Sequence, residues 1–190
     1  MAGVLAPGFA DPVHHAQQAF RALLTAMSEP GTVVTVPAVD APPPMGEGLA
    51  AVALTLCDAD TPVWLAPRFA GEVGDWLTFH TGAVVVADKT RAQFAFAEGV
   101  DLTGLSVGDP VYPDRSATLV AEVAFAGPSF TLEGPGIAGT RTVTAALPKN
   151  FAEAWGRNRA LYPRGVDLVL ADGARLMALP RTTEVSCTLR

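Results

Sequence analysis

Three short segments of the sequence concentrate arginine and hydroxyl side chains that could bind an anion. The nine candidate site residues in them are Asp114, Arg115, Ser116, Arg159, Tyr162, Arg164, Arg181, Thr182 and Thr183. A guanidinium binds two phosphate oxygens at once through its planar fork, so these segments could hold a phosphate group. Arginines near a helix end also form structural ion pairs that need no ligand, and the sequence leaves both interpretations open.

His80 is the tenth candidate, because it follows an aromatic stretch and precedes a Thr-Gly turn. It is either a buried, hydrogen-bonded histidine or a site residue. Cys57 and Cys187 show no metal-ligand spacing and form no disulfide framework, so we expect no metal and a reducing compartment. Lys89 follows an apolar run, where a Schiff-base lysine could stand, but nothing indicates its desolvation. We therefore expect a surface lysine.

Two glycine motifs could carry chemistry if their surroundings were right. Residues 104–108 match G-x-S-x-G, but loop residues flank them where a nucleophile elbow needs a strand and a helix, which favours a surface turn. Residues 134–139 match G-x-G-x-x-G, with Glu153 near the place of a ribose-binding acid. The β-prone segment 140–144 follows where a dinucleotide site needs a helix. The sequence leaves open whether this turn binds a phosphate through its backbone amides or only reverses the chain.

Composition and charge exclude several classes of protein. The 190 residues are 49% hydrophobic and 17% charged, which indicates one folded domain. The net charge of −6 argues against nucleic-acid binding. The longest run without a charged residue is only 76–87, too short for a membrane span of ~20 residues. The first twelve residues lack a basic segment and a long apolar run, so we expect no secretion signal and a cytoplasmic protein.

The positive charge is concentrated near the C-terminus. Residues 1–140 carry four arginines and one lysine against fifteen acidic residues. Residues 141–190 carry seven arginines and one lysine against four acidic residues. An acidic chain therefore ends in a basic quarter, which allows a local anion site without general nucleic-acid binding.

Alternating helices and apolar strands must position these residues. Asp11 and Pro12 indicate the start of a helix that Pro30-Gly31 ends. Further helices are expected at 49–57, 71–79 and 150–161. Strands are expected at 32–36, 62–65, 83–87, 93–97, 116–125, 130–132, 142–144, 166–171 and 175–179. The apolar run 83–87 predicts a strand that is buried on both faces. This order predicts a single three-layer α/β/α domain, residues 1–190, with a mixed sheet.

Several of these segments, in this order, resemble the PhnH family of the bacterial carbon–phosphorus lyase system. The matching pieces are Phe20–Leu24 with Met27 and Pro30-Gly31; Ala53–Leu56 with Asp58 and Thr61–Leu65; Phe79–Gly82; Ser116–Leu119; Gly134–Ile137; Asn158–Pro163 with Gly165–Asp167; and Pro180–Thr183. No single piece is specific, but the ordered set covers nearly the whole chain.

The resemblance implies a subunit of a complex that degrades organophosphonates. Its partners would be the subunits PhnG, PhnI and PhnJ, and the isolated chain would form a homodimer. The complex would form α-D-ribose 1-methylphosphonate 5-triphosphate from ATP and methylphosphonate, a transferase step assigned chiefly to PhnI. The iron–sulfur cluster of a later step would belong to PhnJ, consistent with the lack of a three-cysteine cluster here. The implied fold is a degenerate relative of pyridoxal-phosphate-dependent transferases without the cofactor.

The residues and the resemblance meet in the basic C-terminal quarter, because ATP and phosphonates are both anions. The arginines could hold such an anion or the carboxylates of a partner protein. We expect a structural and assembly subunit, with a phosphate- or phosphonate-binding cleft as an added possibility. The alternative is an autonomous nucleotide- or phosphate-ester-binding enzyme that uses the arginines and the Gly134–Gly139 loop.

Overall fold

The computed structural model describes residues 6–187. The expectation of no secretion signal concerns the first twelve residues, of which 1–5 lie outside the described part. Its four helices are α1 (Pro12–Ser28), α2 (Glu47–Leu56), α3 (Glu72–Thr81) and α4 (Phe151–Arg159). The carboxylate of Asp11 accepts a hydrogen bond from the backbone N–H of His14, and Pro12 opens α1. This start was predicted from the sequence. None of the described helices has the length and apolarity to cross a membrane.

A seven-stranded mixed sheet forms the centre of the molecule. In spatial order its strands are β2 (Val34–Thr35), β11 (Arg175–Leu179), β10 (Asp167–Asp172), β7 (Thr118–Glu122), β6 (Phe94–Glu98), β4 (Pro62–Leu65) and β5 (Val84–Val85). Strands β10, β7, β6, β4 and β5 are parallel neighbours, whereas β11 runs antiparallel to both β10 and β2. A three-stranded antiparallel sheet joins β12 (Glu184–Cys187), β8 (Ser129–Glu133) and β9 (Arg141–Thr144), and β1 (Gly8–Phe9) pairs with β3 (Val39–Asp40).

Successive side chains of the central strands enter two different cores, because side chains alternate between the faces of a strand. Val120 and Val169 pack with the buried faces of α1, α2 and α3. Their neighbours Leu119 and Leu168 pack with α4 and the small sheet. The predicted α/β domain with a mixed sheet is thus confirmed, and its third layer contains the small sheet as well as α4.

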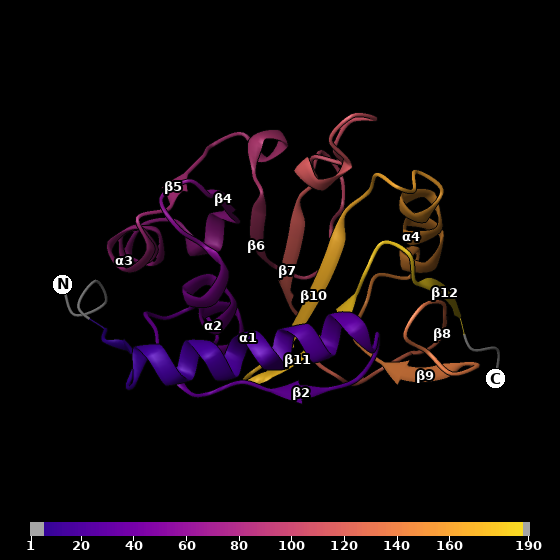
Figure 1. Ribbon diagram of the computed structural model, residues 1–190, viewed down its shortest axis with the longest axis horizontal. Helices are drawn as coiled ribbons and strands as arrows, with labels where there is room; N and C mark the ends of the chain where they lie inside the picture. The colour runs from indigo at the N-terminus through magenta and orange to yellow at the C-terminus, as the bar shows by residue number, and fades with distance from the viewer. Residues whose placement is uncertain (1–5, 188–190) are drawn as a thin grey trace.

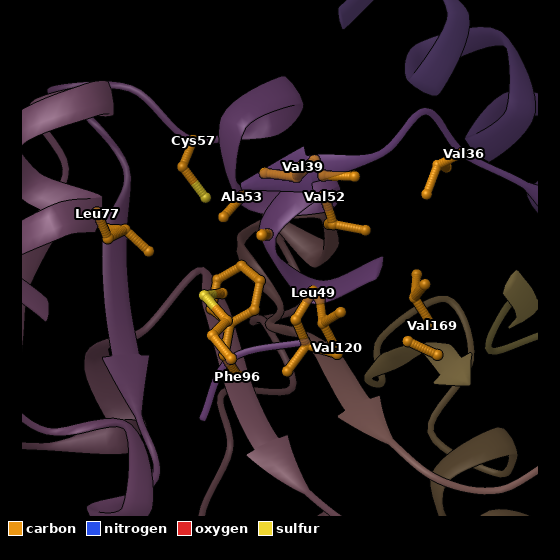
Figure 2. Close-up of a cluster of buried hydrophobic side chains, with 14 of the residues drawn as sticks. Val36, Val39, Leu49, Val52, Ala53, Cys57, Leu77, Phe96, Val120 and Val169 are labelled. Atoms are coloured by element: carbon orange, nitrogen blue, oxygen red, sulfur yellow. The ribbon is translucent and has the colours of Figure 1, made fainter. Parts of the chain in front are cut away.

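The first core gathers side chains from helices, loops and strands that lie far apart in the sequence. Figure 2 shows Leu49 and Val52 of α2 together with Phe96, Val120 and Val169 of the central sheet. Figure 1 shows α1 running along β2 and β11, with α4, β8, β9 and β12 grouped toward the C-terminal end of the chain. The two cores therefore lie on opposite faces of one sheet.

Segment 83–87 differs from its prediction. The structure gives only the short strand β5, at the edge of the sheet, with Val84 and Val85 57% and 42% exposed. The expected burial on both faces was therefore wrong, because an apolar run marks only hydrophobicity and not the position of a strand in the sheet order. The segment expected at 93–97 forms the central strand β6. Strand β12, near the C-terminus, was not predicted.

Candidate functional site

All three candidate segments meet around Arg181 at one edge of the large sheet. We call this group the Arg181 cluster: Arg181, Asp167, Ser116, and the backbone carbonyls of Pro113 and Pro163. Asp167 begins β10 and Ser116 lies just before β7, so the cluster lies at the amino ends of the parallel strands. Open α/β sheets bind ligands beyond the carboxyl ends of their strands, which is the opposite edge.

Every guanidinium donor of Arg181 has an acceptor within the protein. Nε donates to Oδ1 of Asp167 at 3.1 Å, and Nη2 donates to Oδ2 of Asp167 and to Oγ of Ser116, both at 2.5 Å. Nη1 donates to the carbonyls of Pro113 at 2.9 Å and Pro163 at 3.2 Å. A guanidinium has five N–H donors, so none is left for a ligand.

The position of this ion pair also favours a structural contribution. The side chains of Arg181 and Asp167 are only 15% and 17% exposed. The backbone N–H of Arg181 also donates to the Asp167 carboxylate, at 2.7 Å. This hydrogen bond fixes the position of the main chain at Arg181 as well as that of its side chain. Asp167 was not among the predicted site residues, and no sequence signal marked this strand-opening aspartate as the partner of Arg181. The pair joins the loop before β7, the start of β10 and the end of β11.

Arg159 and the residues after Arg181 form a second contact near the end of α4. Nη2 of Arg159 lies 3.2 Å from Oε2 of Glu184, and its Nε donates to the carbonyl of Thr182 at 3.4 Å. Thr183 is fully buried, and its carbonyl accepts a hydrogen bond from Nε1 of Trp155 at 2.8 Å. Oγ1 of Thr183 has no hydrogen-bond partner among the described residues. This group therefore ties α4 to the small sheet.

Arg115 and Arg164 are less fully paired than Arg181. The guanidinium of Arg115 lies over the ring of Tyr112, 3.9 Å from its centroid. Backbone N–H groups of Tyr112 and Val111 lower the pKa of the Asp109 carboxyl below its usual value, and the charges of Arg115 and Arg164 lower it further. The carboxylate of Asp109 therefore interacts electrostatically with both Arg115 and Arg164. Asp114 and Tyr162 are exposed beside this group.

His80 lies on α3, away from the arginine segments. Its Nε2 is 2.9 Å from the carbonyl oxygen of Ala6, and its ring packs against Trp76 and Phe79. These contacts all lie within α3 and the N-terminal segment, and Figure 1 shows α3 and α4 at opposite ends of the large sheet. The structure therefore brings together residues from all three arginine segments but does not bring His80 to them.

The Gly134–Gly139 turn packs against the end of α1. An added Cβ at Gly136, where φ is +81°, would lie 1.9 Å from the carbonyl oxygen of Ser28. Strand β9 follows the turn, in place of the helix that a dinucleotide site needs. Nη1 of Arg141, from β9, donates to the carbonyls of Glu29 and Pro30 at 2.9 and 2.7 Å. The turn therefore faces the carbonyl end of a helix, which repels anions.

The carboxyl ends of the parallel strands present acidic residues. Glu98 and Glu122 are paired in register at the ends of β6 and β7. Burial raises the pKa of the Glu122 carboxyl above its usual value; the charges of Glu98 and Asp172 raise it further, and that of Arg68 opposes them. A cavity of about 370 Å³ near these ends is lined in part by Trp64, Lys89 and Asp101. None of the ten candidate residues lines it.

Comparison with known proteins gives two relatives and one family. Residues 7–186 match the family described as bacterial phosphonate metabolism protein (PhnH). The chain is 45% identical over 186 residues to the alpha-D-ribose 1-methylphosphonate 5-triphosphate synthase subunit PhnH of Rhizobium meliloti (strain 1021), covering 93% of each chain. It is 32% identical over 180 residues to the putative C-P lyase subunit protein HtxG of Stutzerimonas stutzeri, covering 90% of this chain and 85% of that one.

Proposed function

Because this chain belongs to the PhnH family of bacterial phosphonate metabolism proteins, we propose that it is a subunit of a multi-protein system that degrades organophosphonates. In this proposal it acts in the cytoplasm with the subunits PhnG, PhnI and PhnJ and forms a homodimer when isolated. It is needed for the formation of α-D-ribose 1-methylphosphonate 5-triphosphate from ATP and methylphosphonate. It contributes structure and assembly, and it is not an independent catalyst.

The pairing of the Arg181 cluster carries this proposal. A catalytic or substrate-binding arginine must have donors free for the substrate, whereas Arg181 gives all five to protein acceptors. Arg159 is engaged only in part: it contacts Glu184 and the carbonyl of Thr182, and its side chain is 46% exposed. Arg181, and Arg159 in part, therefore hold loops, strands and α4 together, which is consistent with a subunit whose contribution is structural. Arg115, Arg159 and Arg164 remain the candidate arginines with donors available for an added anion.

Calorimetric titration tests whether the isolated chain binds the substrates. We expect no binding of ATP, methylphosphonate or inorganic phosphate with a Kd below about 1 mM, which corresponds to about 4 kcal/mol. Binding tighter than this that disappears in Arg115→Ala or Arg159→Ala would overturn the purely structural version and favour the autonomous nucleotide- or phosphate-ester-binding enzyme. Arg157→Ala is the matched control, because Arg157 is an exposed arginine of α4 whose ion pair in the described chain is the local one with Glu153.

Co-purification tests the subunit role itself. A tagged copy is expressed together with the neighbouring reading frames of its genome and recovered under native conditions. We expect partner subunits in stoichiometric amounts, as in a stable interface that survives washing. Recovery of the tagged chain alone would contradict the proposal.

A further inference from the structure

Helix α1 exposes an apolar stripe that nothing in the described part of the chain covers. Val13, Phe20 and Leu24 are 77%, 46% and 53% exposed. They are separated by seven and four residues, so they share one face of the helix. The buried residues Ala19 and Leu23 each lie one position before a member of the stripe. The apolar surface of α1 is therefore wider than the face that the core uses.

The same helix is almost free of charge. Arg21 is the only Lys, Arg, Asp or Glu among its 17 residues. The adjoining residues 30–39 contain none at all. Residues 12–39 together carry Arg21 and Glu29 and no net charge, in a chain whose net charge is −6 and whose residues are 17% charged. An ordinary solvated helix carries many charges on its outer face, so the outer face of α1 is unusually poor in charge.

The charge-free segment continues into an open edge of the large sheet. Strand β2 is the last in the sheet order, and β11 is its only partner among the described strands. Val33, directly before it, is 48% exposed. Figure 1 shows β2 running beside α1, and the two elements are in contact. We call Val13, Phe20, Leu24 and Val33, with the free edge of β2, the α1–β2 surface. An uncharged open edge is a ready template for pairing with another chain.

We infer that the α1–β2 surface is a docking site for another protein subunit that presents an uncharged, apolar helix or edge strand. The inference rests on the proposed role as a subunit and adds the place of contact. The cores of protein interfaces are depleted of charged residues and enriched in aromatic and aliphatic ones, as this surface is. Burying it removes no charge from water, so the cost of desolvation is small.

The chemistry of the surface selects this occupant over a lipid bilayer or an acidic partner. Helices that lie on anionic membranes carry several Lys and Arg residues on their polar face, and α1 carries one arginine. An acidic protein would find few cations available here, because Arg175 beside β2 already pairs with Asp172 and Arg141 donates to Thr32, which leaves Arg21 of α1. An apolar partner needs no opposite charge on this surface, because its binding free energy comes from the apolar area removed from water.

Charged substitutions on two faces of α1 test the inference. The variant Phe20→Glu/Leu24→Glu places two carboxylates in the stripe. The control Gln18→Glu/Thr25→Glu places the same charge on exposed polar positions of the same helix. Each tagged protein is expressed with the neighbouring reading frames, and the recovered partner subunits are quantified. We expect the stripe variant to lose about tenfold or more of the captured partner and the control to match the wild type.

A second variant guards against an effect on folding. Val33→Glu acts on the sheet-edge part of the surface and should reduce capture as well, while circular dichroism spectra and melting temperatures remain near the wild-type values. Equal capture by the stripe variant and its control would overturn the inference. So would a stripe variant that converts an isolated dimer into monomers yet still captures its partners, because the surface would then serve self-association. Capture of nothing by the wild type would instead refute the proposed function and the inference with it.

Discussion

Residue identity predicted the kind of chemistry near Arg181 but not its partners. The grouping of arginines with hydroxyl residues indicated ion pairs or an anion site, and the structure shows dense pairing around Arg181. The partner Asp167 lies fourteen residues away, and Ser116 lies sixty-five residues away. These contacts depend on the register of β7 and β10, which no local pattern specifies. Sequence reasoning could therefore name the side chains but could not pair them.

The buried hydroxyl of Thr183 gives a prediction at this scale. Its Oγ1 is fully buried without a hydrogen-bond partner in the described chain, which costs free energy. Replacing it by a methyl group of similar shape in Thr183→Val should leave the free energy of unfolding unchanged or raise it by about 1 kcal/mol. Urea denaturation followed by tryptophan fluorescence measures the change.

Ser116→Ala is the contrasting variant, because its hydroxyl accepts a hydrogen bond from Arg181. Its loss leaves a charged, buried donor unsatisfied and should lower the free energy of unfolding by about 1–3 kcal/mol. A loss of stability in Thr183→Val as large as that in Ser116→Ala would mean that the Thr183 hydroxyl has an unrecognised partner.

At the scale of elements, the sequence predicted most helices and strands but not which strands lie next to one another in the sheets. The capped start of α1 and the two strands β10 and β11 were predicted because their signals are local: a capping aspartate before proline, and two apolar runs separated by Asp172-Gly173. The edge position of β5 and the existence of β12 depend on which strands pair across long sequence separations. The likeness to pyridoxal-phosphate-dependent transferases stays a prediction.

The glycine-rich turn before β9 acts as a packing element, and Gly136 tests this. Alanine there must adopt a positive φ and place its Cβ against the carbonyl of Ser28 at the end of α1. The first effect costs about 1–2 kcal/mol, and the overlap adds about 1–3 kcal/mol. Gly139→Ala is the matched control, because its φ is also positive, at +75°, but its Cβ would have no neighbour within 4 Å.

We therefore expect Gly136→Ala to lower the free energy of unfolding clearly more than Gly139→Ala. Chemical denaturation of the two variants beside the wild type measures the difference. Equal losses would show that only the backbone conformation matters and that the turn does not press on α1. If Gly136→Ala instead kept its stability and weakened a measurable binding of inorganic phosphate, the turn would be a phosphate-binding element.

At the scale of the whole molecule, the two cores share one sheet. Leu168 and Val169 are adjacent on β10, yet Leu168 packs with α4 and the small sheet, while Val169 packs with α1, α2 and α3. Neither layer can separate without exposing apolar side chains of the strands beneath it. The charge asymmetry of the sequence does not divide the fold, because Arg141 and Arg181 of the basic quarter join elements that are distant in the chain.

This shared sheet predicts that residues 1–190 unfold as one cooperative domain. Differential scanning calorimetry should show a single transition whose calorimetric and van't Hoff enthalpies agree. Leu168→Ala should lower the free energy of unfolding by about 2–5 kcal/mol, and Val169→Ala should lower it by a smaller amount. Both should move the same transition to lower temperature, although their side chains belong to opposite cores, at about 2–4 °C per kcal/mol for a chain of this length. Val84→Ala, on the exposed edge strand β5, should leave the transition nearly unchanged. Two transitions, with Leu168→Ala shifting one and Val169→Ala the other, would show instead that the layers fold independently and that the sheet does not couple them.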